Sequence, residues 1–209
     1  MMKINFTAVR QRFHGRQIFG PLDAELVSGK ITAVTGRNGS GKSTFLKLAG
    51  HFLPPSAGKI EVTLAGKELT GEELRRRIAM VTPELRFYDR LTARENMDFL
   101  LGLRGLQIGD EDYRALLERV GLEEGAVCHS YAGEFSTGMG QRLKMAVLLA
   151  CRADIWLLDE PGANLDEAGR AMVAQEMRAA AERGVLVAVA TNDPGEEALA
   201  DEVISLAGN

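Results

Sequence analysis

The sequence predicts an α/β fold with a mostly parallel sheet and a helical insertion. Short apolar runs alternate with helix-like segments along most of the chain, which is the pattern of such folds. One of these runs leads through a glycine-rich loop into a helix. The stretch at about 91–152 contains no convincing strand. We therefore expect a single domain over residues 1–209, with an α/β core at about 1–90 and 153–209 and a helical subdomain between them.

The N-terminal part of the predicted core contains three strands, two of which are each linked to a helix. Lys30–Thr35 is a β-branched run, and a helix follows the glycine-rich loop over Phe45–Ala49. Lys59–Leu64 alternates between apolar and polar residues, as a half-exposed strand does. A short helix at Glu72–Arg77 then leads into a strand at Ile78–Val81.

Three helices are expected in the insertion. The first opens at a capping box formed by Thr92 and Glu95 and ends near Leu103. The second is an amphipathic segment at Glu111–Val120, and the third is Thr137–Ala150.

The strand and helix alternation resumes after the insertion. The apolar run Ile155–Leu158 has the length of a buried strand, and a helix is expected near Asp166–Arg183. Strands at Val185–Ala190 and Val203–Leu206 complete the predicted core.

The composition is that of a soluble globular protein, with 45% hydrophobic and 26% charged residues. A net charge of -4 makes nucleic acid a poor partner, because a phosphate backbone repels an acidic domain. The cysteines Cys128 and Cys151 lack metal-ligand spacing, so we expect two reduced thiols. The N-terminus lacks the apolar core of a signal peptide, and no run approaches the roughly 18 apolar residues that cross a bilayer. We therefore expect a cytoplasmic protein that reaches a membrane only through a partner.

The glycine-rich loop has the spacing G-x-x-x-x-G-K-[ST] of a phosphate-binding P-loop. Glycines allow the backbone N–H groups to turn toward phosphate oxygens, and the following helix directs its positive end at the same place. Lys42 can reach the β- and γ-phosphates of ATP, and the Ser43 hydroxyl can ligate Mg²⁺. The residues predicted to bind ATP here are Gly36, Arg37, Asn38, Gly39, Ser40, Gly41, Lys42, Ser43 and Thr44.

Two carboxylates follow the buried strand Ile155–Leu158. They lie at its carboxyl end, where parallel sheets bind ligands. We expect Asp159 to hold Mg²⁺ or its water shell. Glu160 is positioned to polarise the attacking water as a general base. Together with the P-loop, this pair predicts ATP hydrolysis.

Phe135-Ser-Thr-Gly-Met-Gly-Gln-Arg142 resembles the L-S-G-G-Q signature of the ABC ATPase family, and the resemblance extends over nearly the whole chain. It implies a P-loop NTPase (RecA-like) core with N-terminal antiparallel strands. It also implies a head-to-tail dimer, with a second copy or a homologous subunit, in which each signature meets the γ-phosphate held by the other subunit. The residues expected to make this contact are Ser136, Thr137, Gly138 and Met139.

Two weaker matches follow the same order as in the family. Phe13 lies where ABC proteins have an aromatic side chain that stacks on adenine. Ala163-Asn-Leu-Asp166 resembles the D-loop, which helps to join the subunits beside the catalytic carboxylate.

Two positions depart from the family pattern. Glu84 stands near the place of a glutamine that ligates Mg²⁺ and senses the membrane partner; a glutamate can still ligate the metal but adds negative charge. Asn192 stands at the switch position, where the family has a catalytic histidine that contacts the γ-phosphate. An amide can donate a neutral hydrogen bond but cannot become cationic. We therefore expect ATP binding and dimer closure to persist while hydrolysis is slower.

Three functions are compatible with these motifs. The first is the ATPase subunit of a transporter whose membrane-spanning subunits are separate chains. The form of the signature resembles exporter subunits, including the short ATPases of haem-export systems. The second is a soluble ATPase that drives assembly, such as the iron–sulfur assembly type. The third is a nucleotide-responsive module with negligible turnover, although the intact Lys42, Asp159 and Glu160 argue against it.

Overall fold

The computed structural model describes residues 1–206 and divides the chain into two compact units. The first unit comprises Met1–Met80, Asp154–Glu160 and the chain from Met177 onward, and the second comprises Val81–Ala153 and Pro161–Glu176. The last three residues of the predicted domain, 207–209, lie outside the described part. The predicted limits of the helical subdomain, at about 91–152, stay a prediction.

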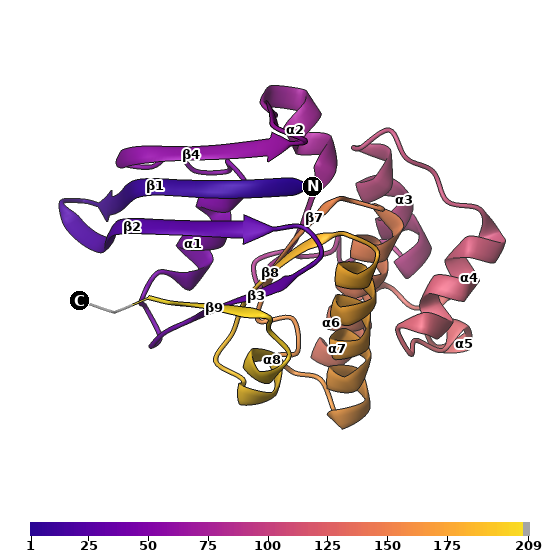
Figure 1. The fold of residues 1–209 in the computed structure, drawn as a ribbon. Coiled ribbons are helices and arrows are strands. Elements are labelled where there is room, and N and C mark those ends of the chain that lie inside the picture. The colour runs from indigo at the N-terminus through magenta and orange to yellow at the C-terminus, as the bar shows by residue number, and fades with distance from the viewer. Residues whose placement is uncertain (207–209) are drawn as a thin grey trace. The chain divides into compact units, whose positions relative to one another are not determined.

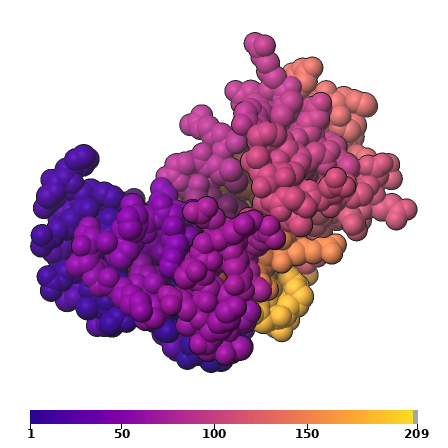
Figure 2. All heavy atoms as spheres, turned by 90° about the horizontal axis from the view of Figure 1, so that it is seen from above, coloured from indigo at the N-terminus to yellow at the C-terminus, as the bar shows by residue number. Residues whose placement is uncertain are grey.

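An antiparallel sheet with strand order β2-β1-β4-β5 is formed by the N-terminal strands. Its strands are β1 (Met2–Phe13), β2 (Arg16–Val27), β4 (Ala57–Leu64) and β5 (Lys67–Glu68). Figure 1 shows β1 between β2 and β4, and both pairings are antiparallel. The indigo and violet residues of these strands form one contiguous surface in the space-filling view (Figure 2). The N-terminal antiparallel strands implied by the resemblance are confirmed.

A second sheet has the order β6-β7-β8-β3-β9, and β3 pairs in parallel with both β8 and β9. Its strands are β3 (Ile31–Thr35), β6 (Ile78–Val81), β7 (Ile155–Asp159), β8 (Leu186–Ala190) and β9 (Glu202–Ser205). Every residue of β7 and β8 is buried, as expected for central strands of a parallel sheet. The predicted mostly parallel α/β core is confirmed.

The helices that accompany the core elements are α1 (Lys42–Ala49), α2 (Gly71–Arg77), α7 (Glu167–Glu182) and α8 (Pro194–Ala198). Helix α1 contacts β7 and β8, and its Phe45 ring stacks on Phe6 of β1 with centroids 4.5 Å apart. This stacking joins the helix after the P-loop to the antiparallel sheet in one hydrophobic core. Helix α8 was not expected; its cap Asp193 accepts a hydrogen bond from Gly195 N–H at 2.6 Å.

The second unit contains α3 (Ala93–Gly102), α4 (Asp110–Arg119), α5 (Glu124–Val127), the 3-10 helix η1 (Ala132–Glu134) and α6 (Thr137–Ala150). The predicted capping box is present: Thr92 Oγ1 accepts from Glu95 N–H at 3.3 Å, and Thr92 N–H donates to the Glu95 carboxylate at 2.8 Å. The short α5 and η1 were not predicted, because segments of three or four residues carry too little periodicity. In residues 1–206, no helix combines the length and apolar character needed to cross a bilayer.

Candidate functional site

The P-loop joins the end of β3 to the start of α1, as the sequence predicts. Gly41 caps α1 in a left-handed conformation, with φ 100°, and no side chain caps the helix. A Cβ atom at this position would lie 2.6 Å from Ile18 Cγ2 and 2.8 Å from Phe19 Cδ1. Glycine therefore satisfies both the backbone turn and the close approach of β2. The first-turn N–H groups of α1 remain available to an anion.

Lys42 is the buried cation of this loop. Its ammonium donates to the carbonyl oxygens of Gly36 at 2.8 Å and Arg37 at 3.4 Å, and to Asn192 Oδ1 at 3.0 Å. The side chain thus curls back over its own loop, where a phosphate held by the loop would also lie.

Asp159 and Glu160 are brought to the same place by the pairing of β7 with β8. Asp159 is buried at the last position of β7 and pairs in register with Ala190. Glu160 follows with a positive φ of 50°, and its N–H donates to the Ala190 carbonyl at 2.9 Å. A positive φ is costly for a residue with a side chain and persists only where surrounding contacts impose it. The backbone at Glu160 therefore turns away from the strand path directly after β7.

Asn192 lies at the corresponding exit of β8. Its amide nitrogen donates to Asn38 Oδ1 at 2.8 Å and to Glu160 Oε1 at 3.4 Å. Its oxygen accepts from Lys42. The predicted switch residue is thus in direct contact with two other predicted catalytic residues.

Lys42, Asp159 and Glu160 line a cavity of about 360 Å³ in the first unit, whereas Asn192 is not among its lining residues. Phe13, which is 40% exposed, and Ile18 contribute its apolar wall. The lining residues are Phe13, Ile18, Asn38, Gly39, Gly41, Lys42, Ser43, Thr44, Asp159 and Glu160. The sequence did not predict that Ile18 lines the cavity, because nothing distinguishes this residue from any other apolar residue of an alternating strand. The cavity combines an apolar wall, a cation and backbone donors, which suits a nucleotide.

The cavity also offers ligands that fit Mg²⁺. Ser43 supplies a hydroxyl and Asp159 a carboxylate, and both are hard oxygen donors of the kind that this metal prefers. Arg37, Gly36 and Ser40 belong to the same loop but do not line the cavity.

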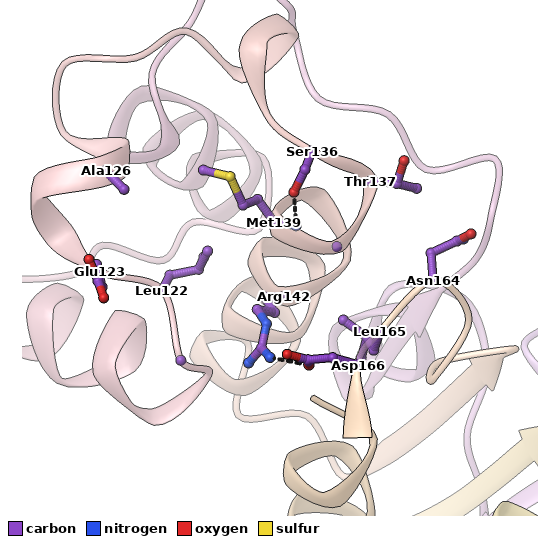
Figure 3. A pocket seen from close by; sticks show the side chains of 12 residues that line it. Leu122, Glu123, Ala126, Ser136, Thr137, Met139, Arg142, Asn164, Leu165 and Asp166 are labelled. Atoms are coloured by element: carbon purple, nitrogen blue, oxygen red, sulfur yellow. Dashed lines mark hydrogen bonds and ion pairs between the residues drawn. The ribbon is translucent and has the colours of Figure 1, made fainter. Parts of the chain in front are cut away.

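The second unit holds the signature residues at the start of α6 (Figure 3). Ser136 caps this helix by accepting a hydrogen bond from Met139 N–H at 3.2 Å, so its hydroxyl proton is still available to a ligand. An open pocket of about 700 Å³ lies over this helix end. It is lined by Gly121, Leu122, Glu123, Ala126, Ser136, Thr137, Gly138, Met139, Arg142, Asn164, Leu165 and Asp166.

Arg142 links three segments that meet at this pocket. Its guanidinium donates to the Val120 carbonyl and to Asp166 Oδ1, both at 2.7 Å (Figure 3). The Gly169 N–H also donates to Asp166, and this hydrogen bond together with Arg142 lowers the pKa of the Asp166 carboxyl. A Cβ atom at Gly121 would lie 2.5 Å from the guanidinium. Arg142 therefore joins the signature helix to the D-loop segment, a role that the sequence did not reveal.

Glu84 belongs to the second unit and is not among the residues that line the cavity of about 360 Å³ in the first. In its own unit, the preceding residues are held by Lys144 of α6, which donates to the Thr82 carbonyl at 2.9 Å and the Pro83 carbonyl at 3.4 Å. Burial lowers the pKa of Lys144, and the negative charge of Glu84 opposes that shift. The negative charge that Glu84 adds at this position thus lies near the Lys144 ammonium. Metal ligation by Glu84 stays a prediction.

Comparison with known proteins places these features in one family. A profile of the ABC transporter family matches residues 19–163. The cytochrome c biogenesis ATP-binding export protein of Bradyrhizobium diazoefficiens is 39% identical over 183 residues, which are 85% of this chain and 86% of that protein. The glutamine transport ATP-binding protein of Escherichia coli is 31% identical over 198 residues, which are 92% of this chain and 82% of that protein.

Solved structures agree with these sequence matches. A bacterial ABC transporter cassette solved as a dimer has a TM-score of 0.83 and 26% identity, covering 97% of this chain and 94% of that one. A structure of the same cassette in a post-hydrolysis state bound to ADP and phosphate matches equally well. A putative ABC transporter ATP-binding protein from Pyrococcus furiosus, at 20% identity and a TM-score of 0.83, supports the fold alone, over 98% of this chain and 97% of that one. The chain therefore belongs to the ABC transporter family, as an ATP-binding subunit whose ATPase activity is coupled to transport.

Proposed function

We propose that the chain hydrolyses ATP in the cavity between the P-loop and the end of β7. One observation carries this proposal: two pairs of residues that are far apart in the sequence, Lys42 with Ser43 and Asp159 with Glu160, line a single cavity. In this assignment the P-loop N–H groups and Lys42 bind the β- and γ-phosphates. Phe13 and Ile18 offer an apolar surface to the adenine.

Glu160 acts as the general base in the proposed reaction. Its carboxylate lies at the cavity wall, where it can accept a proton from the water that attacks the γ-phosphorus. The Asn192 amide donates to the same carboxylate and so helps to orient it. Ser43 and Asp159 would hold Mg²⁺, which supplies neutralisation of the triphosphate charge when it is bound.

The proposed active unit is a head-to-tail dimer in which a second subunit presents its Ser136–Met139 segment to the γ-phosphate. The free Ser136 hydroxyl proton and the positive end of α6 are suited to an anion. Solved structures of a similar cassette as a dimer support the dimeric state.

We further propose that the partner is an exporter located at the inner face of a membrane, with its membrane-spanning subunits on separate chains. Several relatives are named as export proteins of cytochrome c biogenesis, including one from Pseudomonas fluorescens that is 34% identical over 85% of this chain and 82% of that protein. More specifically, we propose that the exporter moves haem or another substrate used in cytochrome c biogenesis.

Two variants test the catalytic assignment. Lys42→Ala should abolish ATP binding, because the loop loses its only cation directed at the phosphates. Glu160→Gln should retain binding but lose turnover and accumulate as an ATP-bound dimer, which size-exclusion chromatography in ATP would detect. Normal phosphate release by Glu160→Gln would remove Glu160 from the role of base.

The partner is tested by co-purification from detergent-solubilised membranes. Recovery of membrane-spanning subunits would support the transporter, and recovery of a soluble scaffold instead would favour an assembly ATPase. Export is tested separately, by following accumulation of labelled haem in vesicles that contain the reconstituted complex. Failure of haem to move, with ATPase activity intact, would reject haem and leave the ATPase assignment standing.

A further inference from the structure

The ammonium of Lys42 donates hydrogen bonds to three protein oxygens, one for each of its N–H donors. Two of the acceptors, the carbonyls of Gly36 and Arg37, belong to the loop itself. The third is Asn192 Oδ1, at 3.0 Å, which comes from the other end of the sequence. An ammonium has no further donor to offer. A phosphate oxygen can therefore bind Lys42 only by displacing one of these partners.

Both the oxygen and the nitrogen of the Asn192 amide make hydrogen bonds. Its oxygen faces Lys42, because an ammonium carries no acceptor atom for the amide nitrogen. Its nitrogen donates to Asn38 Oδ1 at 2.8 Å and, more weakly, to Glu160 Oε1 at 3.4 Å. Asn192 is exposed, so hydrogen bonds rather than apolar packing fix its position.

The backbone around Asn192 is also fixed. The Thr191 N–H donates to the Val34 carbonyl of β3 at 3.2 Å, and the Asp193 N–H donates to Thr191 Oγ1 at 2.9 Å. Asp193 in turn caps α8. The amide is thus presented to Lys42 by a turn that both the sheet and α8 hold in place.

We propose that the Asn192 amide is a latch on Lys42 that competes with a nucleotide phosphate for the ammonium and so weakens nucleotide binding. This proposal rests on the assignment of the cavity as the ATP site. In the proposed competition, a phosphate oxygen takes the place of Asn192 Oδ1 on the ammonium. The free energy of the displaced hydrogen bond therefore counts against binding.

An amide makes this latch independent of pH. Its oxygen is an acceptor at every physiological pH, whereas a histidine ring can accept a hydrogen bond only when it is neutral and, once protonated, has only donors and would repel the ammonium. With asparagine at this position, the hydrogen bond from Lys42 therefore does not depend on pH. It gives position 192 an effect on nucleotide affinity that is separate from any contact with the γ-phosphate.

ADP is the cleaner probe of the latch, since it can engage Lys42 through its β-phosphate but lacks the γ-phosphate that a switch residue contacts. The dissociation constant of fluorescent ADP, in the presence of Mg²⁺, is measured for the full-length wild type, Asn192→Ala and Asn192→Leu. Both variants remove the acceptor, and leucine nearly preserves the side-chain volume. We expect both to bind ADP about fivefold more tightly, which is the net contribution of one typical hydrogen bond.

Glu197→Gln on α8 serves as the matched control, because Glu197 is exposed and does not line the cavity. It should bind ADP as the wild type does. Unchanged or weaker ADP binding by Asn192→Ala and Asn192→Leu, with a wild type that binds, would overturn the latch and leave the ATP site intact. A wild type that binds neither ADP nor ATP would instead overturn the proposed function itself.

Discussion

The contact between the P-loop and β2 gives a quantitative prediction for Gly41→Ala. The alanine would have a left-handed φ of 100°. Its Cβ atom would lie 2.6 Å from Ile18 and 2.8 Å from Phe19. A left-handed conformation costs an L-residue about 1–2 kcal/mol, and overpacking against a buried ring adds about 1–3 kcal/mol. Since Phe19 is buried and cannot move freely, we expect a loss of about 2–5 kcal/mol in the free energy of unfolding.

Gly39→Ala is the matched control for this substitution. Gly39 has a similar φ of 81°, but a Cβ atom there would meet nothing within 4 Å. We therefore expect it to lose only about 1–2 kcal/mol, from the backbone alone. The difference between the two variants measures the steric contact of the loop with β2.

Urea unfolding followed by tryptophan fluorescence measures both variants. Trp156 is the only tryptophan of the chain and is buried in β7, so its emission reports on the unit that contains the loop. Gly41→Ala should also bind ADP more weakly, because the start of α1 must shift. Equal destabilisation by the two variants would refute the reasoning that β2 packs against and restrains the loop.

Three further predictions concern the site and the stability of each unit. Asn192→His should raise the steady-state ATPase rate, about tenfold, because an imidazolium can donate a charge-assisted hydrogen bond to the γ-phosphate; an equal or lower rate would contradict this. Arg119→Met should lower the free energy of unfolding by about 2–3 kcal/mol, measured by circular dichroism, because it removes both hydrogen bonds to the buried Glu176. Arg114→Met on the same helix removes an exposed ion pair and should lower it by less than about 1 kcal/mol. Equal losses would show that the burial of Glu176 does not matter. Burial lowers the pKa of His51 below its usual 6.5, so the unfolded chain binds that proton more readily and stability falls as the pH drops below 6.5. His51→Asn, which tolerates the left-handed φ of 55° at this position, should flatten that dependence in urea titrations between pH 7 and about 5, and an unchanged slope would rule out His51 as its source.

Local sequence determined those features whose physical cause lies within a few residues. The capping box of Thr92 and Glu95 forms as predicted, because both hydrogen bonds join neighbours on one helical turn. The path from strand through P-loop to helix follows from the glycines of Gly36–Thr44 and the flanking apolar runs. The sequence also predicted the buried strand that leads to Asp159, because four consecutive apolar residues are typical of a strand in the core of a soluble fold.

The tertiary structure decided which of these features meet. The local sequence patterns of β7 and β8 do not indicate that the two strands are neighbours. The pairing of Asp159 with Ala190 nevertheless brings Glu160 and Asn192 together at the strand ends. The bond between Lys42 and Asn192 depends in turn on β3 lying directly beside β8. The sequence by itself thus identified the chemical groups of an ATPase. The order of strands in the sheet, a property of long-range pairing rather than of local periodicity, determined that the switch amide holds the P-loop lysine.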